Sequence, residues 1–285
     1  MSYEEKKERL KQRIKEYIKS DCMVAFSGGV DSSLLLRIVC EAAESSASGE
    51  DKKANIKVYA VTMKTRLHPV KEIENAAKVA AEIGVQHLIV PVDELLEAGI
   101  FDNPQERCYL CKKHLFSRIL DVAKERGVST ILEGTNEEDL HMYRPGLKAI
   151  RELGIKSPLA EAGFTKKEVR ILAAEYGLSV SDRPAAPCLA TRFPYGTRLS
   201  YEKFQRVEQG EQILKAYGFY NVRLRVHDEI LRIEVDPEAF PKLLSHREKI
   251  AAQLKRLGYS YITLDLEGFR SGSMDIGLQG SNNGV

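Results

Sequence analysis

The sequence predicts an α/β protein with a doubly wound parallel sheet, followed by a smaller α+β domain. Short apolar segments alternate with helical patterns over residues 22–133, which is typical of a parallel sheet flanked by helices. A glycine-rich turn joins the first apolar segment directly to a helix. A proline-containing stretch without clear periodicity, residues 179–199, then separates this region from a shorter mixture of helices and strands.

The elements of the first domain follow one another as strand, loop and helix. A charged amphipathic helix opens the chain. After it we expect strands at residues 22–26, 56–62, 85–92 and 130–133, and helices at residues 33–43, 70–83 and 109–126. Such sheets bind ligands at the carboxyl ends of the strands, where the strand order reverses. Glycines follow the first and fourth strands, in the motifs Ser27-Gly28-Gly29 and Glu133-Gly134-Thr135-Asn136.

The last part of the chain predicts a domain boundary and a tail. The motif Thr165-Lys166-Lys167-Glu168 has capping-box spacing and opens a helix that stops at Gly177. Beyond it we expect helices at residues 200–217 and 238–257, and strands at residues 221–226, 230–235 and 261–266. We therefore divide the chain into domains 1–194 and 195–270. Residues 271–285, rich in Gly, Ser and Asn, are expected to form a flexible tail.

Composition limits the classes of function. The chain has 285 residues, 43% of them hydrophobic and 29% charged, which is enough for one large core and a smaller one. Its 43 basic and 41 acidic residues are too balanced for binding nucleic acid by bulk charge, so we expect a small-molecule ligand and no nucleic acid. Apolar stretches are short and the N-terminus is rich in Lys and Glu, so we expect a cytoplasmic protein without a membrane span. We also expect a homo-oligomer. Five cysteines suit reduced thiols, a metal or catalysis better than a disulfide framework.

The strongest chemical signal is Ser27-Gly28-Gly29-Val30-Asp31-Ser32-Ser33, between a buried strand and a helix. Glycines let the backbone aim N–H groups inward, and the helix N-terminus adds donors and a positive dipole end. With hydroxyls from Ser27, Ser32 and Ser33, the segment predicts a nest for a phosphate. A glycine turn with a serine N-cap is the simpler alternative. The pattern of a Walker lysine is absent, which disfavours transfer of the γ-phosphate.

This loop resembles the pyrophosphate-binding loop of the PP-loop ATP pyrophosphatases, which include GMP, asparagine and NAD synthetases and tRNA thiolases. The resemblance implies an adenine nucleotide alpha hydrolase-like fold that holds the β and γ phosphates of ATP as leaving pyrophosphate. AMP then goes to the substrate, with Mg²⁺ shared between the phosphates. The implied ATP-binding residues are Ser27, Gly28, Gly29, Asp31, Ser32, Gly134 and Asn136.

The cysteine-containing segments point to one family within this superfamily. Cys108 and Cys111 form a C-x-x-C pair, and Cys188 lies in Pro187-Cys188-Leu189-Ala190-Thr191-Arg192. Together with Glu133-Gly134-Thr135-Asn136 and Tyr143-Arg144-Pro145-Gly146, these segments are similar to those of LarE-type sulfur transferases, over roughly the first 270 residues. The resemblance implies adenylation of a carboxylate of pyridinium-3,5-biscarboxylate mononucleotide, followed by replacement of its oxygen with sulfur. The product serves nickel-pincer cofactor synthesis.

Members of this family differ in their cysteines. Some have only the cysteine that matches Cys188 and sacrifice its sulfur, which leaves dehydroalanine. Members with all three are proposed to hold an iron–sulfur cluster, so the resemblance implies a [4Fe-4S] cluster on Cys108, Cys111 and Cys188. By itself the C-x-x-C pair is equally consistent with a zinc site that includes His114, or with a redox pair. Cys22 and Cys40 are expected to be core thiols.

Paired arginines in the second domain suggest a substrate site. Alternation places Arg223 and Arg225 on one face of a strand, where two guanidiniums suit a phosphate. A solvated face with cross-strand ion pairs is the alternative. The resemblance implies substrate residues Arg223, Arg225 and Glu234 and catalytic residues Cys188, Glu211 and Arg192, in a cleft between the domains. Glu138 and Met142 stand where aspartates are expected, which leaves the role of Asp139 open.

Other classes remain open at this point. A tRNA thiolase would share the loop and a cysteine trio, but usually brings further C-x-x-C pairs or a basic RNA-binding domain. An ammonia-using synthetase needs a glutaminase, and the second residue is Ser2 rather than a nucleophilic cysteine. A non-enzymatic sensor would bind ATP without releasing pyrophosphate.

Overall fold

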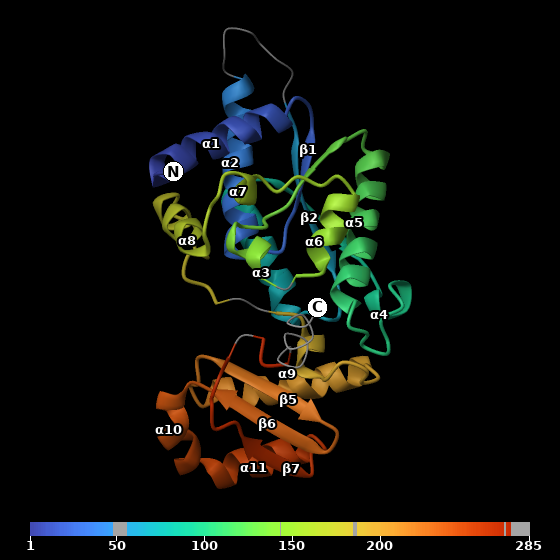
Figure 1. Cartoon of the computed structure of the whole chain (residues 1–285), viewed down its shortest axis with the longest axis vertical. Coiled ribbons are helices and arrows are strands. Elements are labelled where there is room, and N and C mark those ends of the chain that lie inside the picture. The colour runs from blue at the N-terminus through green and yellow to red at the C-terminus, as the bar shows by residue number, and fades with distance from the viewer. Residues whose placement is uncertain (48–55, 143, 185–186, 271, 275–285) are drawn as a thin grey trace, which may run out of the picture. The chain divides into compact units, whose positions relative to one another are not determined.

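The chain divides into two compact units in a computed structural model, which describes residues 1–47, 56–142, 144–184, 187–270 and 272–274 (Figure 1). The first unit contains residues 1–99 and 106–186, and the second contains residues 100–105 and 187–285. Tyr143 and, apart from residues 272–274, the expected flexible tail lie outside the described residues.

A parallel sheet of four strands, in the order β3-β2-β1-β4, forms the centre of the first unit. The strands are β1 (Cys22–Ala25), β2 (Val58–Lys64), β3 (Gln86–Pro91) and β4 (Thr130–Leu132). The chain adds β2 and β3 on one side of β1 and then returns to place β4 on the other side. The strand order therefore reverses between β1 and β4, which confirms the doubly wound sheet.

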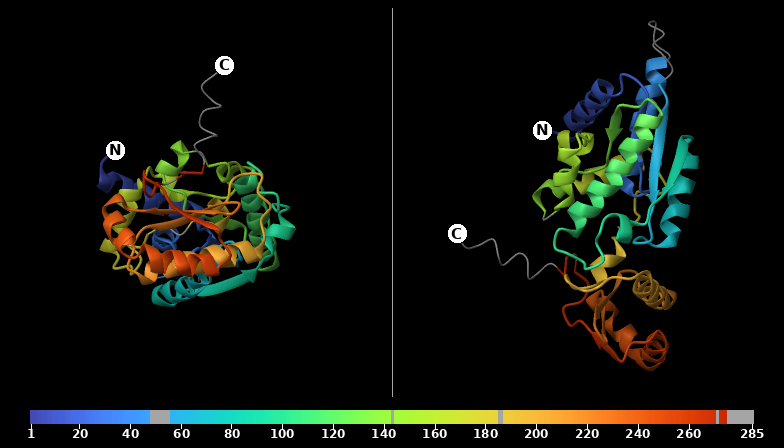
Figure 2. Two further views of the ribbon diagram at one scale, coloured as in Figure 1. Left: turned by 90° about the horizontal axis from the view of Figure 1, so that it is seen from below. Right: turned by 90° about the vertical axis from the view of Figure 1, so that its right-hand side faces the viewer.

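Helices cover both faces of this sheet (Figures 1 and 2). They are α1 (Tyr3–Tyr17), α2 (Val30–Ala47), α3 (Val70–Ile83), α4 (Glu94–Glu97), α5 (Arg107–Glu125), α6 (Gly146–Glu152), α7 (Pro158–Glu161) and α8 (Lys166–Glu175), with a 3₁₀ turn η1 (Glu138–His141). The short helices α4, α6 and α7 were not predicted. The predicted capping box of α8 is present, with Thr165 accepting from the Glu168 amide.

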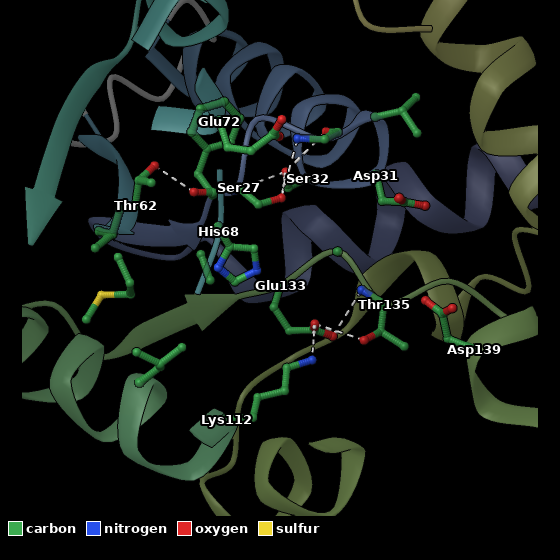
Figure 3. Close-up of a pocket in the computed structure, with 18 of the residues that line it drawn as sticks. Ser27, Asp31, Ser32, Thr62, His68, Glu72, Lys112, Glu133, Thr135 and Asp139 are labelled. Carbon is green, nitrogen blue, oxygen red and sulfur yellow. Dashed lines mark hydrogen bonds and ion pairs between the residues drawn. The ribbon is translucent and has the colours of Figure 1, made fainter. Parts of the chain in front are cut away.

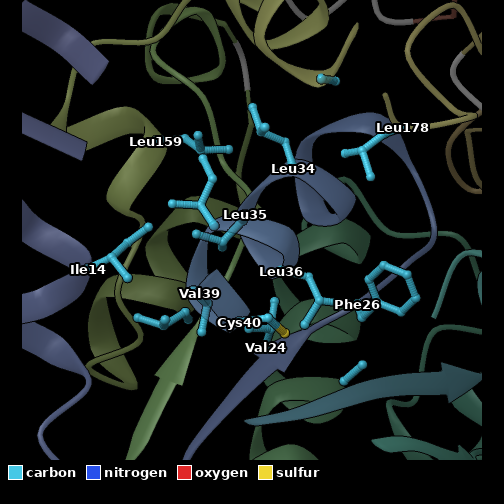
Figure 4. Packing of buried hydrophobic residues seen from close by; sticks show 14 of the residues in the cluster. Ile14, Val24, Phe26, Leu34, Leu35, Leu36, Val39, Cys40, Leu159 and Leu178 are labelled. Atoms are coloured by element: carbon cyan, nitrogen blue, oxygen red, sulfur yellow. The ribbon is translucent and has the colours of Figure 1, made fainter. Parts of the chain in front are cut away.

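Alternate residues of β1 enter different cores. Cys22 and Val24 pack with α1, α2, α3 and α8, whereas Met23 packs with α5 and α6. Helix α2 is buried on nearly all sides: Leu34, Leu35 and Leu36 of this helix are fully buried (Figure 4). Burial of each leucine side chain contributes roughly 1.5–3 kcal/mol, so the helix after the glycine loop is firmly anchored.

Helix α2 begins at Val30, three residues before the predicted start at Ser33. The Ser33 amide already donates to the Gly29 carbonyl at 3.0 Å, which closes the first helical turn. Asp31 and Ser32 therefore lie in that turn, where backbone N–H groups lack intrahelical acceptors.

The second unit is a small α+β fold, as expected. Its sheet has the order β5-β6-β7, with β5 antiparallel and β7 parallel to β6. Close packing marks the helical face: a Cβ on Gly210 would lie 2.5 Å from Leu224 Cδ1. The elements are η2 (Leu189–Arg192), α9 (Tyr201–Ala216), β5 (Val222–His227), β6 (Ile230–Val235), η3 (Pro237–Ala239), α10 (Phe240–Ser245), α11 (Arg247–Arg256) and β7 (Tyr261–Leu264).

The helix predicted over residues 238–257 is wrong in one respect, because it breaks at His246 into α10 and α11. The Ser245 hydroxyl donates to the Lys242 carbonyl at 2.8 Å, and His246 Nδ1 lies 2.9 Å from the same oxygen. Such local side-chain bonds compete with the helical backbone pattern.

The division between the units also differs from the expected boundary at residue 194, since it falls at residue 186. Residues 100–105 join the second unit because Asn103 is fully buried there. Its amide donates to the carbonyls of Phe193 at 3.2 Å and Pro194 at 2.7 Å. Within the described residues, no helix has the length and apolar character needed to cross a membrane.

Candidate active site

The loop between β1 and α2 has the backbone geometry of a phosphate nest. Gly28 has a φ of +71°, in the left-handed region that favours glycine. A Cβ at this position would lie 2.7 Å from Ala76 Cα of α3, so a side chain has no room. Only glycine combines this φ with such a close approach. The sequence correctly indicated a tight turn, but it could not indicate that α3 closes over it.

Hydroxyl groups tie the loop to the start of α2. The Ser27 amide donates to Ser32 Oγ at 3.3 Å, and the two hydroxyl oxygens lie 3.2 Å apart. Ser32 Oγ also donates to the Gly29 carbonyl at 3.2 Å. The expectation that Ser33 shares this concavity is wrong: Ser33 is fully buried and does not line the cavity. One helical position beyond Ser32 turns its side chain away from the loop.

Residues after β4 complete the site from the other side of the switch point. A Cβ on Gly134 would lie 2.9 Å from the Ser32 amide nitrogen, so this glycine lets two backbones meet. The Asn136 side-chain amide donates to Asp31 Oδ1 at 3.1 Å. The backbone amide of Asn136 donates to Asp139 Oδ2 at 3.3 Å, and the backbone amide of Asp139 donates to Asn136 Oδ1 at 3.2 Å. Glu138, one of the unexpected residues, accepts from the Lys166 amide at 3.0 Å and thereby caps α8.

A cavity of about 420 Å³ lies beside this loop (Figure 3). Of the predicted ATP-binding residues, five line it: Ser27, Gly29, Asp31, Ser32 and Gly134. Gly28 and Asn136 shape it through the contacts described above. The cations that line it were missed by sequence reasoning: Lys112, Arg144, Lys166, Arg170 and Arg183.

Two of these cations contact the phosphate loop itself. Lys166 is the first residue of α8, and its Nζ pairs with Asp31 Oδ2. Arg183 donates to the Gly28 carbonyl at 3.2 Å and to Glu72 of α3 at 2.6 Å. The chain thus places a lysine near the loop without a Walker motif. The capping box that opens at Thr165 was the one available signal for this position.

A buried carboxylate faces the loop across the cavity. Glu133 is 5% exposed and accepts from the Thr135 amide at 3.1 Å, the Thr135 hydroxyl at 2.8 Å and the Ser157 hydroxyl. Lys112 Nζ lies 3.6 Å from it. Figure 3 shows Lys112 and Glu133 across the cavity from Ser27 and Ser32. Lys112 directly follows Cys111, so the helix with the C-x-x-C pair also reaches this cavity.

The start of the loop is fixed by a further pair that sequence reasoning missed. Thr62 Oγ1 donates to the Phe26 carbonyl at 2.6 Å and lies 2.7 Å from His87 Nε2. Because the hydroxyl has one proton, His87 Nε2 must donate to Thr62. Burial lowers the pKa of His87, so the ring is neutral at pH 7. These two hydrogen bonds, from His87 to Thr62 and from Thr62 to Phe26, hold the carbonyl immediately before the phosphate loop.

Cys108 and Cys111 lie on the first two turns of α5, with Cys108 exposed and Cys111 half-buried. Three positions apart on a helix, they share a face, and the helix N-terminus favours thiolates. Arg107 Nη2 lies 3.7 Å from Cys108 Sγ. His114, considered for zinc, lies 3.2 Å from Glu97. In the described part of the chain, no group of three His, Cys, Asp or Glu side chains is arranged to hold a metal.

Cys188 belongs to the second unit and caps the turn η2, half-buried. The carbonyl of Cys188 accepts from the Thr191 amide at 3.1 Å, the Thr191 hydroxyl at 2.8 Å and Arg192 Nη1 at 3.1 Å. Arg192 in turn pairs with Glu211 of α9 at 2.9 Å, and both are buried. Cys188, Arg192 and Glu211 are therefore linked by hydrogen bonds through Arg192; their catalytic roles stay a prediction.

The arginine face of β5 is more enclosed than the sequence indicated. Arg225 is 4% exposed and pairs at 2.9 Å with Glu234, which is fully buried. Arg223 is half-buried, and its guanidinium lies 5.2 Å from the Phe269 ring. Burial lowers the pKa of Arg223 to about 10, and nearby Arg192 contributes to this shift. Two arginines, Arg192 and Arg225, and two glutamates, Glu211 and Glu234, also act on Arg223, so the group as a whole carries an excess positive charge that favours an anionic ligand.

Comparisons with known proteins agree with this geometry. Residues 7–119 match the family model of asparagine synthase. The pyridinium-3,5-bisthiocarboxylic acid mononucleotide synthase of Lactiplantibacillus plantarum is 38% identical over 252 residues, which are 88% of this chain and 88% of that protein. An uncharacterized protein of Synechocystis is 35% identical over 274 residues, covering 95% of this chain and 97% of its own.

A more distant similarity bears on the thiolase alternative. The tRNA-specific 2-thiouridylase of Rickettsia bellii is 27% identical over 198 residues. That match covers 58% of this chain and 52% of the thiouridylase, less than either relative above.

Proposed function

The chain belongs to the LarE-type family of the PP-loop superfamily, together with the synthase of L. plantarum, and we propose that it shares that synthase's chemistry. It is an ATP-dependent sulfur transferase. In the proposed reaction, it adenylates a carboxylate of pyridinium-3,5-biscarboxylate mononucleotide and replaces the activated oxygen with sulfur. The product would enter nickel-pincer cofactor synthesis.

The observation that carries the proposal is the phosphate loop with its cationic cavity. The loop presents backbone N–H groups and the Ser27 and Ser32 hydroxyls, while Lys166 and Arg183 stand beside it. These groups suit the β and γ phosphates, which would leave together as pyrophosphate. A substrate carboxylate oxygen attacks the α-phosphorus, and the bond from that phosphorus to the bridging oxygen breaks. The products of this step are an acyl-adenylate and pyrophosphate.

Asp31 and Asp139 fit a magnesium ion that accompanies ATP. Both carboxylates line the cavity, and magnesium is usually bound by one or two carboxylates plus phosphate oxygens. Burial raises the pKa of Asp139; Arg144 opposes this shift, and the carboxylate of Asp31 adds to it. A cation would relieve that repulsion. When bound, the ion would neutralise charge on the phosphates.

Sulfur transfer is assigned to the three cysteines. Cys108, Cys111 and Cys188 would hold a [4Fe-4S] cluster, which supplies a transferable sulfide when bound. The two thiols on one helix face fit such a ligand set, and Cys188 would provide the third. Transfer of one sulfide to the acyl carbon would displace AMP and leave a thiocarboxylate. Arg223 would hold the phosphate of the mononucleotide, and Glu211, Arg192, Arg225 and Glu234 would complete that site.

The test is product analysis with ATP, magnesium and the pyridinium mononucleotide. AMP and pyrophosphate are expected, and Asp31→Ala or Ser32→Ala should abolish their formation. Formation of ADP and orthophosphate would refute the central assignment. Protein mass after one turnover separates the sulfur routes, because sacrifice of Cys188 lowers it by the mass of hydrogen sulfide.

The tRNA thiolase is the second candidate, favoured only by the partial similarity to the 2-thiouridylase. It predicts that the protein retains tRNA at moderate salt and thiolates it. Absence of retention, together with turnover of the mononucleotide, would exclude it. A nucleotide sensor predicts ATP binding without pyrophosphate release.

A further inference from the structure

Two buried ion pairs contact the turn that carries Cys188. Arg192 and Glu211 are 2% and 4% exposed, and Arg225 and Glu234 are 4% and 0% exposed. All four side chains belong to the second unit. Burying a charged pair has a large desolvation cost, so such pairs are poor evidence for stability by themselves. The remaining hydrogen bonds of the two guanidiniums indicate what these pairs do.

Every nitrogen of the Arg192 guanidinium has an acceptor. Nε and Nη2 donate to the two oxygens of Glu211, at 2.9 and 3.0 Å. Nη1 donates to the carbonyls of Pro187 at 3.0 Å and Cys188 at 3.1 Å, and to the Thr191 hydroxyl at 3.0 Å. The Thr191 hydroxyl in turn donates to the Cys188 carbonyl. Arg192 therefore contacts the backbone on either side of the cysteine side chain.

Arg225 repeats this arrangement from the neighbouring sheet. Its Nε and Nη2 lie 3.0 and 2.9 Å from Glu234 Oε2, and Nη1 donates to the Thr191 carbonyl at 2.9 Å. The other Glu234 oxygen accepts from Arg232 and Ser273. A substrate phosphate that took the Nε and Nη2 side of Arg225 would have to displace a fully buried carboxylate. Arg223 is half-buried and donates to the Val222 carbonyl at 2.6 Å.

We propose that Arg192 and Arg225 are positioning residues that fix the Cys188 turn, and that neither binds the substrate phosphate. The glutamates neutralise and orient the guanidiniums, whose remaining N–H groups hold the backbone carbonyls at residues 187, 188 and 191. The thiol is thereby presented in one orientation. The proposal rests on the proposed function only where it assigns Cys188 to sulfur transfer. It replaces the sequence-based roles of Arg225 in phosphate binding and of Arg192 in catalysis.

Hydrogen exchange of the full-length protein tests the structural part. Arg192→Lys and Arg225→Lys keep the charge but lack the rigid planar fork that donates to a carboxylate on one side and to backbone carbonyls on the other. Amides of residues 188–193 should exchange roughly tenfold faster in both variants, with little change elsewhere in the unit. Arg223→Lys and Arg198→Lys serve as controls, since Arg198 forms an exposed pair with Asp102 in the same unit. Uniformly faster exchange across the unit would indicate a merely structural role and overturn the proposal.

Kinetics test the functional part. In both positioning variants, kcat for thiocarboxylate formation should fall roughly tenfold while KM for the mononucleotide stays within about twofold. Arg223→Lys should instead raise KM for the mononucleotide and leave kcat nearly unchanged. A raised KM in Arg225→Lys with unchanged exchange at residues 188–193 would refute the proposal. Should a lysine variant not fold, Glu211→Gln and Glu234→Gln are judged by the same criteria. If no thiocarboxylate forms even in the wild type, the proposed function fails, and exchange still decides the positioning role.

Discussion

Lys166 Nζ pairs with Asp31 Oδ2 although 135 positions separate the two residues in the chain. The pair joins the first position of α8 to the first turn of α2. Both groups line the same cavity, so an incoming phosphate or metal ion would meet a lysine and an aspartate that already neutralise each other. The lysine can then turn to a phosphate while the aspartate turns to a cation.

Replacement of Lys166 should weaken the use of ATP. A hydrogen bond to a charged group is worth roughly 1.5–3 kcal/mol, so Lys166→Ala should raise KM for ATP about tenfold or more. Pyrophosphate release measures this change. Lys167→Ala is the matched control because the neighbouring lysine is exposed and does not line the cavity beside the phosphate loop. Equal effects of the two substitutions would contradict the assignment.

The two loop glycines should differ sharply in their tolerance of a methyl group. Gly28→Ala forces a Cβ to 2.7 Å from Ala76 Cα at a φ of +71°, so it should cost about 1–3 kcal/mol of stability and abolish ATP binding. In Gly29→Ala, the added Cβ would have Ser27 Oγ, at 3.4 Å, as its one neighbour within 4 Å, and the backbone amide is kept. It should therefore bind ATP nearly as the wild type does. Thermal melting and ATP titration of both variants check the contrast.

Anaerobically purified protein should contain iron and sulfide. Cys108→Ser, Cys111→Ser and Cys188→Ser should each lose most of the iron, because each removes a proposed thiolate ligand. Cys22→Ser and Cys40→Ser are controls: burial raises the pKa of Cys22 to about 12 and that of Cys40 to about 11, so these thiols stay protonated. Stoichiometric zinc without iron would rule out the cluster.

Loss of Arg223 should affect the mononucleotide far more than ATP. Arg223→Ala removes a cation that has other cations nearby and should weaken mononucleotide binding about tenfold or more. ATP affinity should barely change, since the loop and its cavity belong to the other unit. Calorimetric titration with each ligand is the measurement. Parallel losses for both ligands would point to a general defect in folding.

Acidification should weaken the second unit through Glu211. Burial alone would raise the pKa of this carboxyl, but the Arg192 guanidinium beside it makes the net shift downward. A lowered pKa adds stability that is complete above the unfolded-state value, about 4.3, and is lost as pH falls through the folded-state value. Glu211→Gln should therefore lose less stability than the wild type when pH falls below about 4.3, measured by denaturant unfolding. Glu202→Gln, exposed on the same helix, should follow the wild-type curve.

Local patterns were sufficient to predict the sheet and the phosphate loop. Alternation of strands and helices specifies a doubly wound sheet, and the glycines after β1 and β4 mark its switch point. The cations of the site could not be predicted in this way. Arg183 meets the Gly28 carbonyl across 155 positions, and only the packing of α3 and α8 brings such residues together. The sequence pattern also gave no sign of burial: alternation placed Arg223 and Arg225 on one face and allowed cross-strand ion pairs there, but only on a solvated face, whereas the Arg225–Glu234 pair is buried.

We expect residues 100–105 to be needed when the second unit is produced as a separate fragment. Asn103 is fully buried in the second unit and holds the carbonyls of Phe193 and Pro194, while the Leu199 amide donates to the Phe101 carbonyl at 2.7 Å. A fragment that starts at residue 187 lacks this hexapeptide and would expose the surface that it covers. Adding the hexapeptide back through a short linker, or as a separate peptide, should restore cooperative melting. Inheritance of the second unit as a contiguous gene segment would thus require a substitute for these six residues.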